Sequence, residues 1–226
     1  MVRRTKEDAL STRRNLLDAA EELFQEQGVS RTSLQEIAKR AGATRGAIYW
    51  HFRDKADLFN AMMERVTLPM EECFERHGST LPRIDTDKDA IDNIWQAITD
   101  CLEQISRDPQ IRRILEVATL KVEYVDELHA VRERHINVRN AFLARFEQSI
   151  CTAAQQQKLK LPIPVNVAAN GFHALIDGLI QNWLLDQTAF DLLNTGQAMM
   201  RIYLNGLGFT TDPQTKTNPH HAMGVQ

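Results

Sequence analysis

Glycine, proline and cysteine are scarce in this chain of 226 residues, which contains 10 Gly, 7 Pro and 3 Cys. The scarcity of Gly and Pro excludes a low-complexity or loop-rich chain and predicts a sizeable hydrophobic core. No apolar run reaches the length of about 18 residues that spans a bilayer. The first thirty residues are charged throughout, so a secretory signal is not expected either. These absences predict a cytoplasmic globular protein without a membrane partner.

The three cysteines lie far apart and do not follow the spacing of metal ligands. Cys73, Cys101 and Cys151 each lie among apolar positions of expected helices, where a free cysteine usually acts as a small hydrophobic side chain. A redox-sensing role is the alternative. The adjacent His220 and His221 lie in a polar tail and are not expected to bind a metal, so neither a metal nor a cofactor is predicted.

Motifs that would indicate an enzyme are missing as well. The sequence has no Gly-rich phosphate loop, no paired-Cys or His-x-x-x-His spacing and no nucleophile motif. No catalytic residue is therefore predicted, and the function classes that remain are a regulator and a helical interaction module.

Apolar residues recur at helical spacing along almost the whole chain, and no alternating strand pattern appears. The pattern predicts an all-α protein with a basic arm (1–10), a short helical region (11–55), a longer helical region (56–209) and a disordered tail (210–226). Residues 78–86 form the clearest internal loop, and Pro69 is expected to end or kink a helix. The expected helices cover about residues 11–27, 33–41, 44–52, 54–69, 91–105, 109–122, 126–157, 165–185 and 195–207.

The net charge of −3 does not by itself indicate a DNA-binding protein. Positive charge is nevertheless concentrated near the N-terminus. Residues 39–55 contain five basic side chains and one acidic side chain, and the first six residues add Arg3, Arg4 and Lys6 without an acid. A local basic cluster of this kind is typical of the part of a chain that contacts nucleic acid.

Residues 32–52 contain the parts of a helix-turn-helix, two short helices joined by a turn at Gly42. Ser33 and Glu36 form a capping-box pattern at the start of the first helix, and Thr44 is placed to cap the second. The alternative is a packed helical corner without a DNA-binding role.

The second short helix begins with Thr-Arg-Gly at 44–46 and ends with Tyr-Trp-His at 49–51. The N-terminal end of a recognition helix meets base edges, where Arg45 suits guanine O6 and N7 and Gly46 allows a close approach of the backbone. Large side chains with polar tips suit phosphate contact, although a structural role for Trp50 is the alternative. Helical spacing predicts Arg45, Tyr49 and Trp50 on one side of this helix and Ile48 and Phe52 on the other.

The run TSLQEIAKRAGATRGAIYWHFRDKADLF, residues 32–59, resembles the DNA-binding domain of the TetR family of regulators. The opening MVRRTKEDA and the block TRGAIYWHF resemble its AcrR-like multidrug-efflux branch, as do residues 120–124 and 177–184. The resemblance implies that the basic arm, through Arg3 and Arg4, tracks a minor groove. It further implies base contacts by Thr44, Arg45 and Gly46, phosphate contacts by Ser33, Tyr49, His51 and Lys55, and a place beside the DNA backbone for Trp50.

The resemblance also implies that residues 11–55 form the helix-turn-helix DNA-binding domain. It implies that residues 56–209 form a helical C-terminal domain that forms a homodimer and encloses an inducer pocket. Residues 165–185 agree with dimerisation because apolar side chains occupy nearly every side of the expected helix, and such a helix is buried on more than one face. Residues 195–207 are similar, so two helices from each subunit would form a four-helix interface. Burial inside a monomer is the alternative.

Large apolar and aromatic side chains with a few polar groups are the candidates for a ligand pocket, since such a lining suits bulky amphipathic compounds. For any one of them an ordinary helical core is the alternative. Asp177 is the strongest candidate, because a carboxylate in an apolar helix is costly unless it is paired, for example with His173, or faces a cavity. The candidates are Trp95, Ile98, Leu115, Thr119, Phe142, Phe146, His173, Ile176 and Asp177.

The resemblance predicts a repressor whose dimer binds double-stranded operator DNA and controls a multidrug efflux operon, with its own gene as a second target. A hydrophobic inducer is expected to move the helix at 109–122, and the helix that starts at Asp54 is expected to change the spacing of the recognition helices. Some similar repressors carry His-Lys-Cys-Glu-Phe where this chain has residues 120–124, so the inducer range does not transfer. A regulator of the same type that senses a lipid, quorum signal or metabolite, or that activates transcription, is the alternative.

Overall fold

The computed structural model describes residues 6–76, 90–123 and 128–210. Within these ranges the regular elements are α-helices and no strand occurs, which confirms the all-α prediction. The helices are α1 (Lys6–Gln27), α2 (Leu34–Arg40), α3 (Arg45–His51), α4 (Lys55–Arg76), α5 (Ala90–Arg107), α6 (Pro109–Leu120), α7 (His129–Gln156), α8 (Val165–Leu185) and α9 (Leu192–Gly206).

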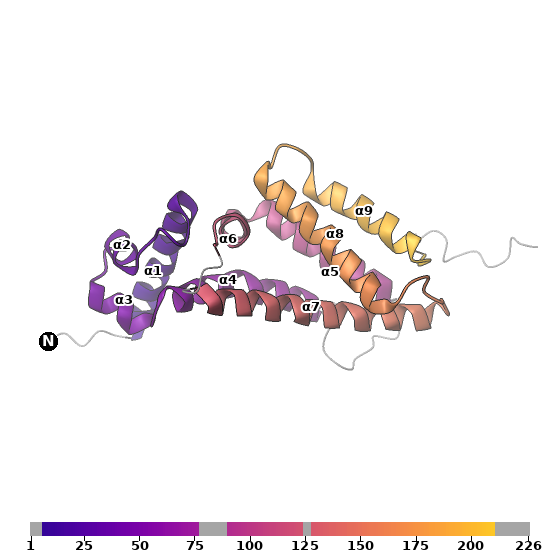
Figure 1. The fold of residues 1–226 in the computed structure, drawn as a ribbon, viewed down its shortest axis with the longest axis horizontal. Helices are drawn as coiled ribbons and strands as arrows, with labels where there is room; N and C mark the ends of the chain where they lie inside the picture. The colour runs from indigo at the N-terminus through magenta and orange to yellow at the C-terminus, as the bar shows by residue number, and fades with distance from the viewer. Residues whose placement is uncertain (1–5, 77–89, 124–127, 211–226) are drawn as a thin grey trace, which may run out of the picture.

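The molecule is elongated, with α1, α2 and α3 grouped at one end (Figure 1). Helix α4 leads out of this group and lies beside α7, which it contacts. Helices α5, α7, α8 and α9 pack against one another at the other end. Helix α6 is seen end-on in Figure 1, between the N-terminal group and α8, and it contacts α1 and α4 on one side and α5 and α8 on the other.

Local capping explains where several helices begin. The hydroxyl of Ser33 accepts from the backbone N–H of Glu36, and the Glu36 carboxylate accepts from the backbone N–H of Ser33 at 2.8 Å, which completes the predicted capping box. Thr44 caps α3, and Asp108 followed by Pro109 starts α6. The turn before α3 requires Gly42, whose φ of +64° lies in the left-handed region.

Three helix boundaries differ from the expected ones. Helix α1 begins at Lys6, inside the segment expected to be an arm. Helix α9 begins at Leu192 because the Asp191 carboxylate accepts from the backbone N–H of Asn194 at 2.8 Å. Helix α4 does not end at Pro69 but continues to Arg76. The expected loop at 78–86, Arg3 and Arg4 of the arm, and residues 211–226 of the expected tail lie outside the described residues.

The hydrophobic core runs continuously from the N-terminal helices into the C-terminal ones. The apolar face of α1 is buried through Leu16, Leu17 and Phe24, and Ile37 and Ile48 complete the small core of the first three helices. No helix among the described residues is long and apolar enough to cross a membrane. One charged side chain of α1, that of Glu21, is buried with the apolar groups.

Candidate DNA-binding and ligand-binding sites

Helices α2 and α3 are joined by a tight turn that fixes their relative orientation. The backbone N–H of Ala43 donates to the carbonyl of Ala38 at 2.8 Å across the turn. Ile37 of α2 and Ile48 of α3 have fully buried side chains, which pack into the same core. The inner faces of the two helices are therefore fixed, and the outer face of α3 is left to solvent.

The outer face of α3 carries the side chains that the sequence predicts as DNA contacts. Arg45 and Gly46 are exposed at its N-terminal end, and Tyr49 and Trp50 are 48% and 73% exposed. The Arg45 guanidinium lies 5.8 Å from the centre of the Tyr49 ring. Trp50 is therefore not part of the core of this chain, and its predicted place beside the DNA backbone stays a prediction.

Two rings next to this face show how the end of α3 is anchored. His51 is half-buried and meets the Trp50 ring edge-on, with 4.5 Å between ring centres. Phe52, as predicted, points to the opposite side and is buried, with the Arg13 guanidinium 5.2 Å from its ring centre. Arg13 was not among the predicted residues, since nothing in its spacing relates it to α3.

The position of Lys55 contradicts the predicted phosphate contact. Its side chain is only 7% exposed, and its ammonium donates to the backbone carbonyls of Ser30 and Thr32 at 3.1 and 3.2 Å. The side chain turns inward because these carbonyls lie in the segment before α2 and need donors. Lys55 thus holds that segment against the start of α4.

Ser33 is exposed, but its hydroxyl also donates to the Glu36 carboxylate at 2.7 Å. These hydrogen bonds hold the pKa of Glu36 below its ordinary value, so the carboxylate is ionised. A phosphate would have to replace this carboxylate at the hydroxyl. Ser33 lines a hollow of about 380 Å³, whose other walls include Arg31, Tyr49, Arg53 and Lys55. Exposed Arg31 and Arg53 were missing from the predicted contacts.

Ion pairs reduce the positive charge that the sequence places near α3. Arg40 donates to Glu22 and Glu26 of α1 at 3.2 and 2.9 Å. It therefore fastens α2 to α1 and is not available as an isolated charge. Arg53 lies 3.8 Å from Asp57, but its side chain is 86% exposed and faces solvent.

Three of the nine predicted ligand-binding residues lie together between α7 and α8. The rings of Phe142 and Phe146 are 6.0 Å apart, and the His173 ring meets Phe142 edge-on at 5.3 Å. The row continues through two rings that were not predicted, Phe172 at 4.3 Å from Phe146 and Tyr203 at 5.6 Å from Phe172. Their sequence signal was an aromatic residue within an apolar helix, which the pattern alone does not distinguish from core.

The other candidates are more scattered. The Trp95 ring lies 5.6 Å from the guanidinium of Arg201 on α9. Ile98 and Ile176 are buried in the core, which agrees with the alternative that these two side chains belong to an ordinary helical core. The remaining candidates, Leu115 and Thr119 on α6 and Asp177 on α8, are half-buried.

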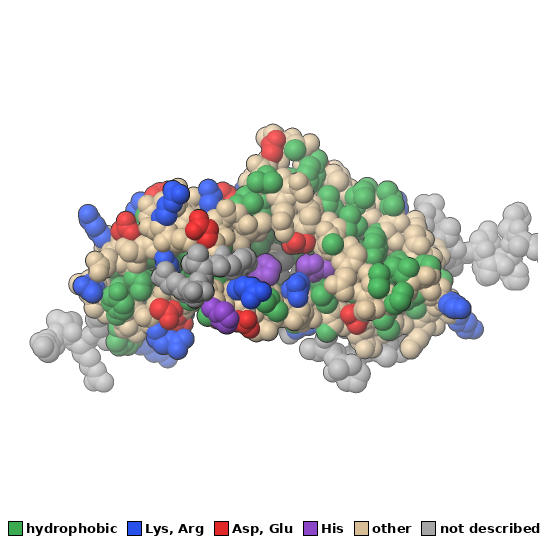
Figure 2. All heavy atoms as spheres, in the orientation of Figure 1, with side chains coloured by type: hydrophobic (Ala, Val, Ile, Leu, Met, Phe, Trp, Pro, Cys, Tyr) green, Lys and Arg blue, Asp and Glu red, His purple; other side chains and the backbone are tan. Residues whose placement is uncertain are grey.

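Asp177 is paired, but the structure gives it a hydrogen-bond partner other than the predicted one. Its carboxylate accepts from the side-chain amide of Gln181, one turn further along α8, at 2.6 Å. Burial lowers the pKa of His173, and the Asp177 carboxylate opposes that shift. Arg139 and His135 of α7 also act on His173 and favour the neutral imidazole. Figure 2 shows histidine, basic and acidic side chains around a hollow on the visible face.

An exposed, polar and aromatic recognition helix on a helix-turn-helix, followed by a larger helical domain, is typical of a DNA-binding regulator. Residues 16–62 match the model of bacterial regulatory proteins of the tetR family, and residues 89–209 match the C-terminal region of MAATS-type transcriptional repressors. The chain belongs to the TetR family of regulators.

Its similarity to individual proteins extends over most of the chain. It is 34% identical to the HTH-type transcriptional regulator AcrR of Shigella flexneri over 90% of this chain and 93% of that protein. NalD, the secondary repressor of the MexAB-OprM multidrug efflux pump in Pseudomonas aeruginosa, is 35% identical, with a TM-score of 0.78 over 89% of this chain and 98% of NalD. The SmeT–triclosan complex is 29% identical, with a TM-score of 0.72 over 86% and 90% of the two chains.

Proposed function

We propose that this chain is a cytoplasmic transcriptional repressor that binds operator DNA as a homodimer and controls a multidrug efflux operon. The observation that carries the proposal is the outer face of α3, where Arg45, Tyr49 and Trp50 are exposed on a helix whose inner face is fixed by the core. A guanidinium at the start of such a helix suits a guanine in the major groove. The relatives that repress efflux pumps support the choice of target.

Exposed apolar side chains on α8 and α9 support the homodimer. Val167 and Leu185 of α8 are 49% and 68% exposed, and Ile202 of α9 is 64% exposed. Large apolar side chains on adjacent helices are typical of a surface that a partner covers. A second copy that packs the same two helices against them would form a symmetric four-helix interface.

A hydrophobic or amphipathic compound is the proposed inducer. Half-buried Phe142 at the end of the aromatic row offers a ring face, and neutral His173 and the carboxylate of Asp177 offer polar contacts beside it. The triclosan complex of SmeT supports a small aromatic ligand for a protein of this fold. The proposed action is binding alone, without catalysis.

Fluorescence anisotropy with labelled DNA from upstream of the protein's own gene, and from upstream of neighbouring efflux genes, tests the proposal. We expect tight binding that weakens steeply with salt, and release on addition of triclosan as a probe. Trp50→Ala should weaken binding, whereas Val138→Ala, on the partly exposed surface of α7, should not. Equal affinity for all of these fragments and for unrelated DNA of the same length would overturn the proposal.

A further inference from the structure

Arg45 is the side chain that the proposed function assigns to base recognition, and few neighbours on α3 are placed to hold it. A helical side chain meets those three and four positions further along. The third position is Ile48, which is fully buried, and the fourth is Tyr49, which is exposed on the same outer face as Arg45. Gly46, next to Arg45, has no side chain. Tyr49 is therefore the large exposed side chain of α3 that lies within reach of Arg45.

The Arg45 side chain is in contact with this ring in the absence of DNA. Its guanidinium carbon lies over the Tyr49 ring, 5.8 Å from the centre, which is within the range of a cation–π contact. Arg40 and Arg53, the basic side chains before and after α3, form ion pairs with carboxylates. In the described ranges 6–76, 90–123 and 128–210, no carboxylate forms such a pair with Arg45. Arg45 thus differs from both neighbours in being held by a ring.

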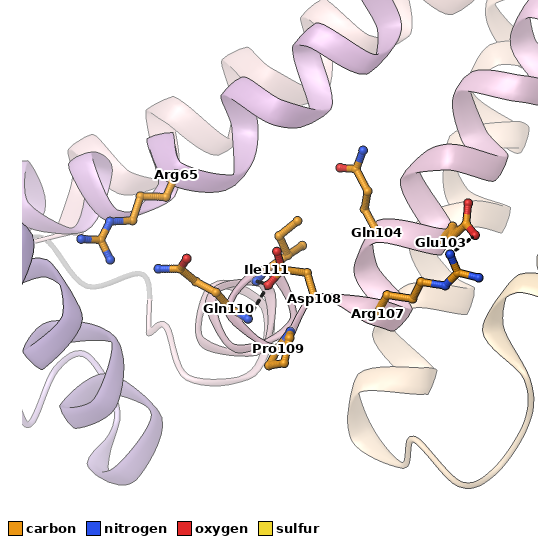
Figure 3. A pocket seen from close by; sticks show the side chains of 8 residues that line it. All are labelled: Arg65, Glu103, Gln104, Arg107, Asp108, Pro109, Gln110 and Ile111. Carbon is orange, nitrogen blue, oxygen red and sulfur yellow. Dashed lines mark hydrogen bonds and ion pairs between the residues drawn. The ribbon is translucent and has the colours of Figure 1, made fainter.

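Arg107 of α5 shows how a carboxylate holds an exposed arginine at the same spacing of four residues. Its guanidinium pairs with Glu103 at 2.6 Å, beside a hollow of about 720 Å³ between α4, α5 and α6 (Figure 3). A carboxylate occupies N–H donors at the edge of the guanidinium, and its charge would repel DNA phosphates. An aromatic ring contacts the flat face of the guanidinium instead. Tyr49 can therefore hold Arg45 while the N–H donors stay free for guanine O6 and N7.

We propose that Tyr49 is a positioning residue for base recognition, whose ring holds the Arg45 guanidinium on the outer face of α3 before DNA binds. The proposal rests on the proposed function, and it gives Tyr49 a role beyond the phosphate contact that the resemblance implies. A long side chain loses rotamer freedom when it binds a base, and one that is already ordered loses less. The gain exists only where Arg45 contacts a base. The ring therefore raises discrimination between DNA sequences more than affinity for all DNA.

A double-mutant cycle tests whether Tyr49 acts through Arg45. Anisotropy titrations give the ratio of two affinities, one for the upstream fragment that the wild type binds most tightly and one for unrelated DNA of the same length. Tyr49→Leu should reduce this ratio about two- to fivefold, because the leucine side chain cannot hold a guanidinium. In an Arg45→Ala background the same change should leave the ratio as it is. An equal reduction in both backgrounds would contradict the proposal.

Two further variants separate the ring of Tyr49 from its hydroxyl and from its position. Tyr49→Phe keeps the ring and should keep the ratio, even where loss of the hydroxyl lowers the affinity for both DNAs. Trp50→Leu makes the same aromatic-to-leucine change one position further on, where the helix turns the side chain away from Arg45. Its effect on the ratio should be the same with and without Arg45. A ratio that falls as far in Tyr49→Phe as in Tyr49→Leu would assign the role to the hydroxyl and refute the proposal.

A measurement without DNA judges the ring contact directly. The NMR order parameter of the Arg45 Nε–H group, assigned by its absence in Arg45→Lys, should fall in Tyr49→Leu and stay high in Tyr49→Phe. An unchanged order parameter in folded Tyr49→Leu would rule the contact out. Circular dichroism checks folding, and Tyr49→Met takes the place of a leucine variant that does not fold. If the wild type preferred no upstream fragment, the proposed function would fail, while the order parameters would still decide whether Tyr49 holds Arg45.

Discussion

The outer face of α3 and the row of rings between α7 and α8 are built in opposite ways. On α3, short-range rules place each side chain: Thr44 caps the helix, Ile48 enters the core, and Tyr49 and Trp50 stay in solvent. Between α7 and α8, each ring depends on a partner from another helix, as Phe146 does on Phe172 at 4.3 Å. A change on α3 should therefore affect binding without affecting the fold, and a change in the row should affect the fold first.

The largest effect is expected from Phe172→Ala. Phe172 is fully buried between Phe146 and Tyr203, and truncation of such a ring typically costs about 3–5 kcal/mol of unfolding free energy. Urea denaturation measures it, with Val138→Ala as a control on the surface of α7. A loss below about 1 kcal/mol would mean that the row is a loosely packed pocket wall and not core.

Arg45→Ala should have the next largest effect, on DNA recognition alone. Loss of a bidentate contact to guanine costs about 1–3 kcal/mol of discrimination between operator and unrelated DNA. Anisotropy titrations measure that ratio, and the melting temperature should not change because Arg45 is exposed. Arg107→Ala, an exposed arginine on α5, is the control. A fall in the melting temperature of the Arg45 variant would break the contrast between the two regions.

Lys55→Met should destabilise the protein by about 1–3 kcal/mol, because the carbonyls of Ser30 and Thr32 lose a charged donor. The dependence of DNA affinity on salt should stay the same. Exposed Arg53 provides the comparison: Arg53→Ala should leave stability unchanged and reduce the salt dependence by about one counterion. If the Lys55 variant instead keeps its stability and loses salt dependence, Lys55 contacts a phosphate after all.

The smallest effect concerns pH. Burial lowers the pKa of His173 below its ordinary value of 6.5, so the unfolded chain takes up a proton more readily than the folded chain as the pH falls. The stability contribution of the neutral imidazole is thus present above pH 6.5 and is lost as the pH falls through the folded pKa. When the pH is lowered from about 7.5 to 5.5, the His173→Gln variant should lose less stability than the wild type. Thermal melts of both proteins at each pH measure the loss. If the variant and the wild type lost the same stability over this pH range, the His173 imidazole would be exposed to water in the folded protein.

Helix boundaries with side-chain caps were predictable from the sequence, since a cap and its helix lie within a few residues of each other. Ser33 and Thr44 both cap the helices expected of them. The start of α9 was missed because Asp191 lies outside the apolar pattern. The end of α4 was missed because the helix continues through Pro69 despite the missing backbone donor.

The candidate sites were predictable only where exposure follows from helical spacing. The outward direction of Arg45 and Trp50 needed nothing beyond the core-facing pattern of α3. The inward turn of Lys55 depends on carbonyls more than twenty residues earlier in the chain, and Trp95 meets Arg201 through packing of α5 on α9. Such contacts between distant segments leave no trace in a local pattern.

The burial of Lys55 has a practical consequence for measurements at high salt. Ions from solution have little access to an ammonium that is 7% exposed and already bonded to two carbonyls. The segment that sets the start of α2 should then keep its shape while salt competes for the exposed arginines. Lys55 should therefore contribute nothing to the slope of a salt titration, and that slope can be assigned to the exposed basic side chains.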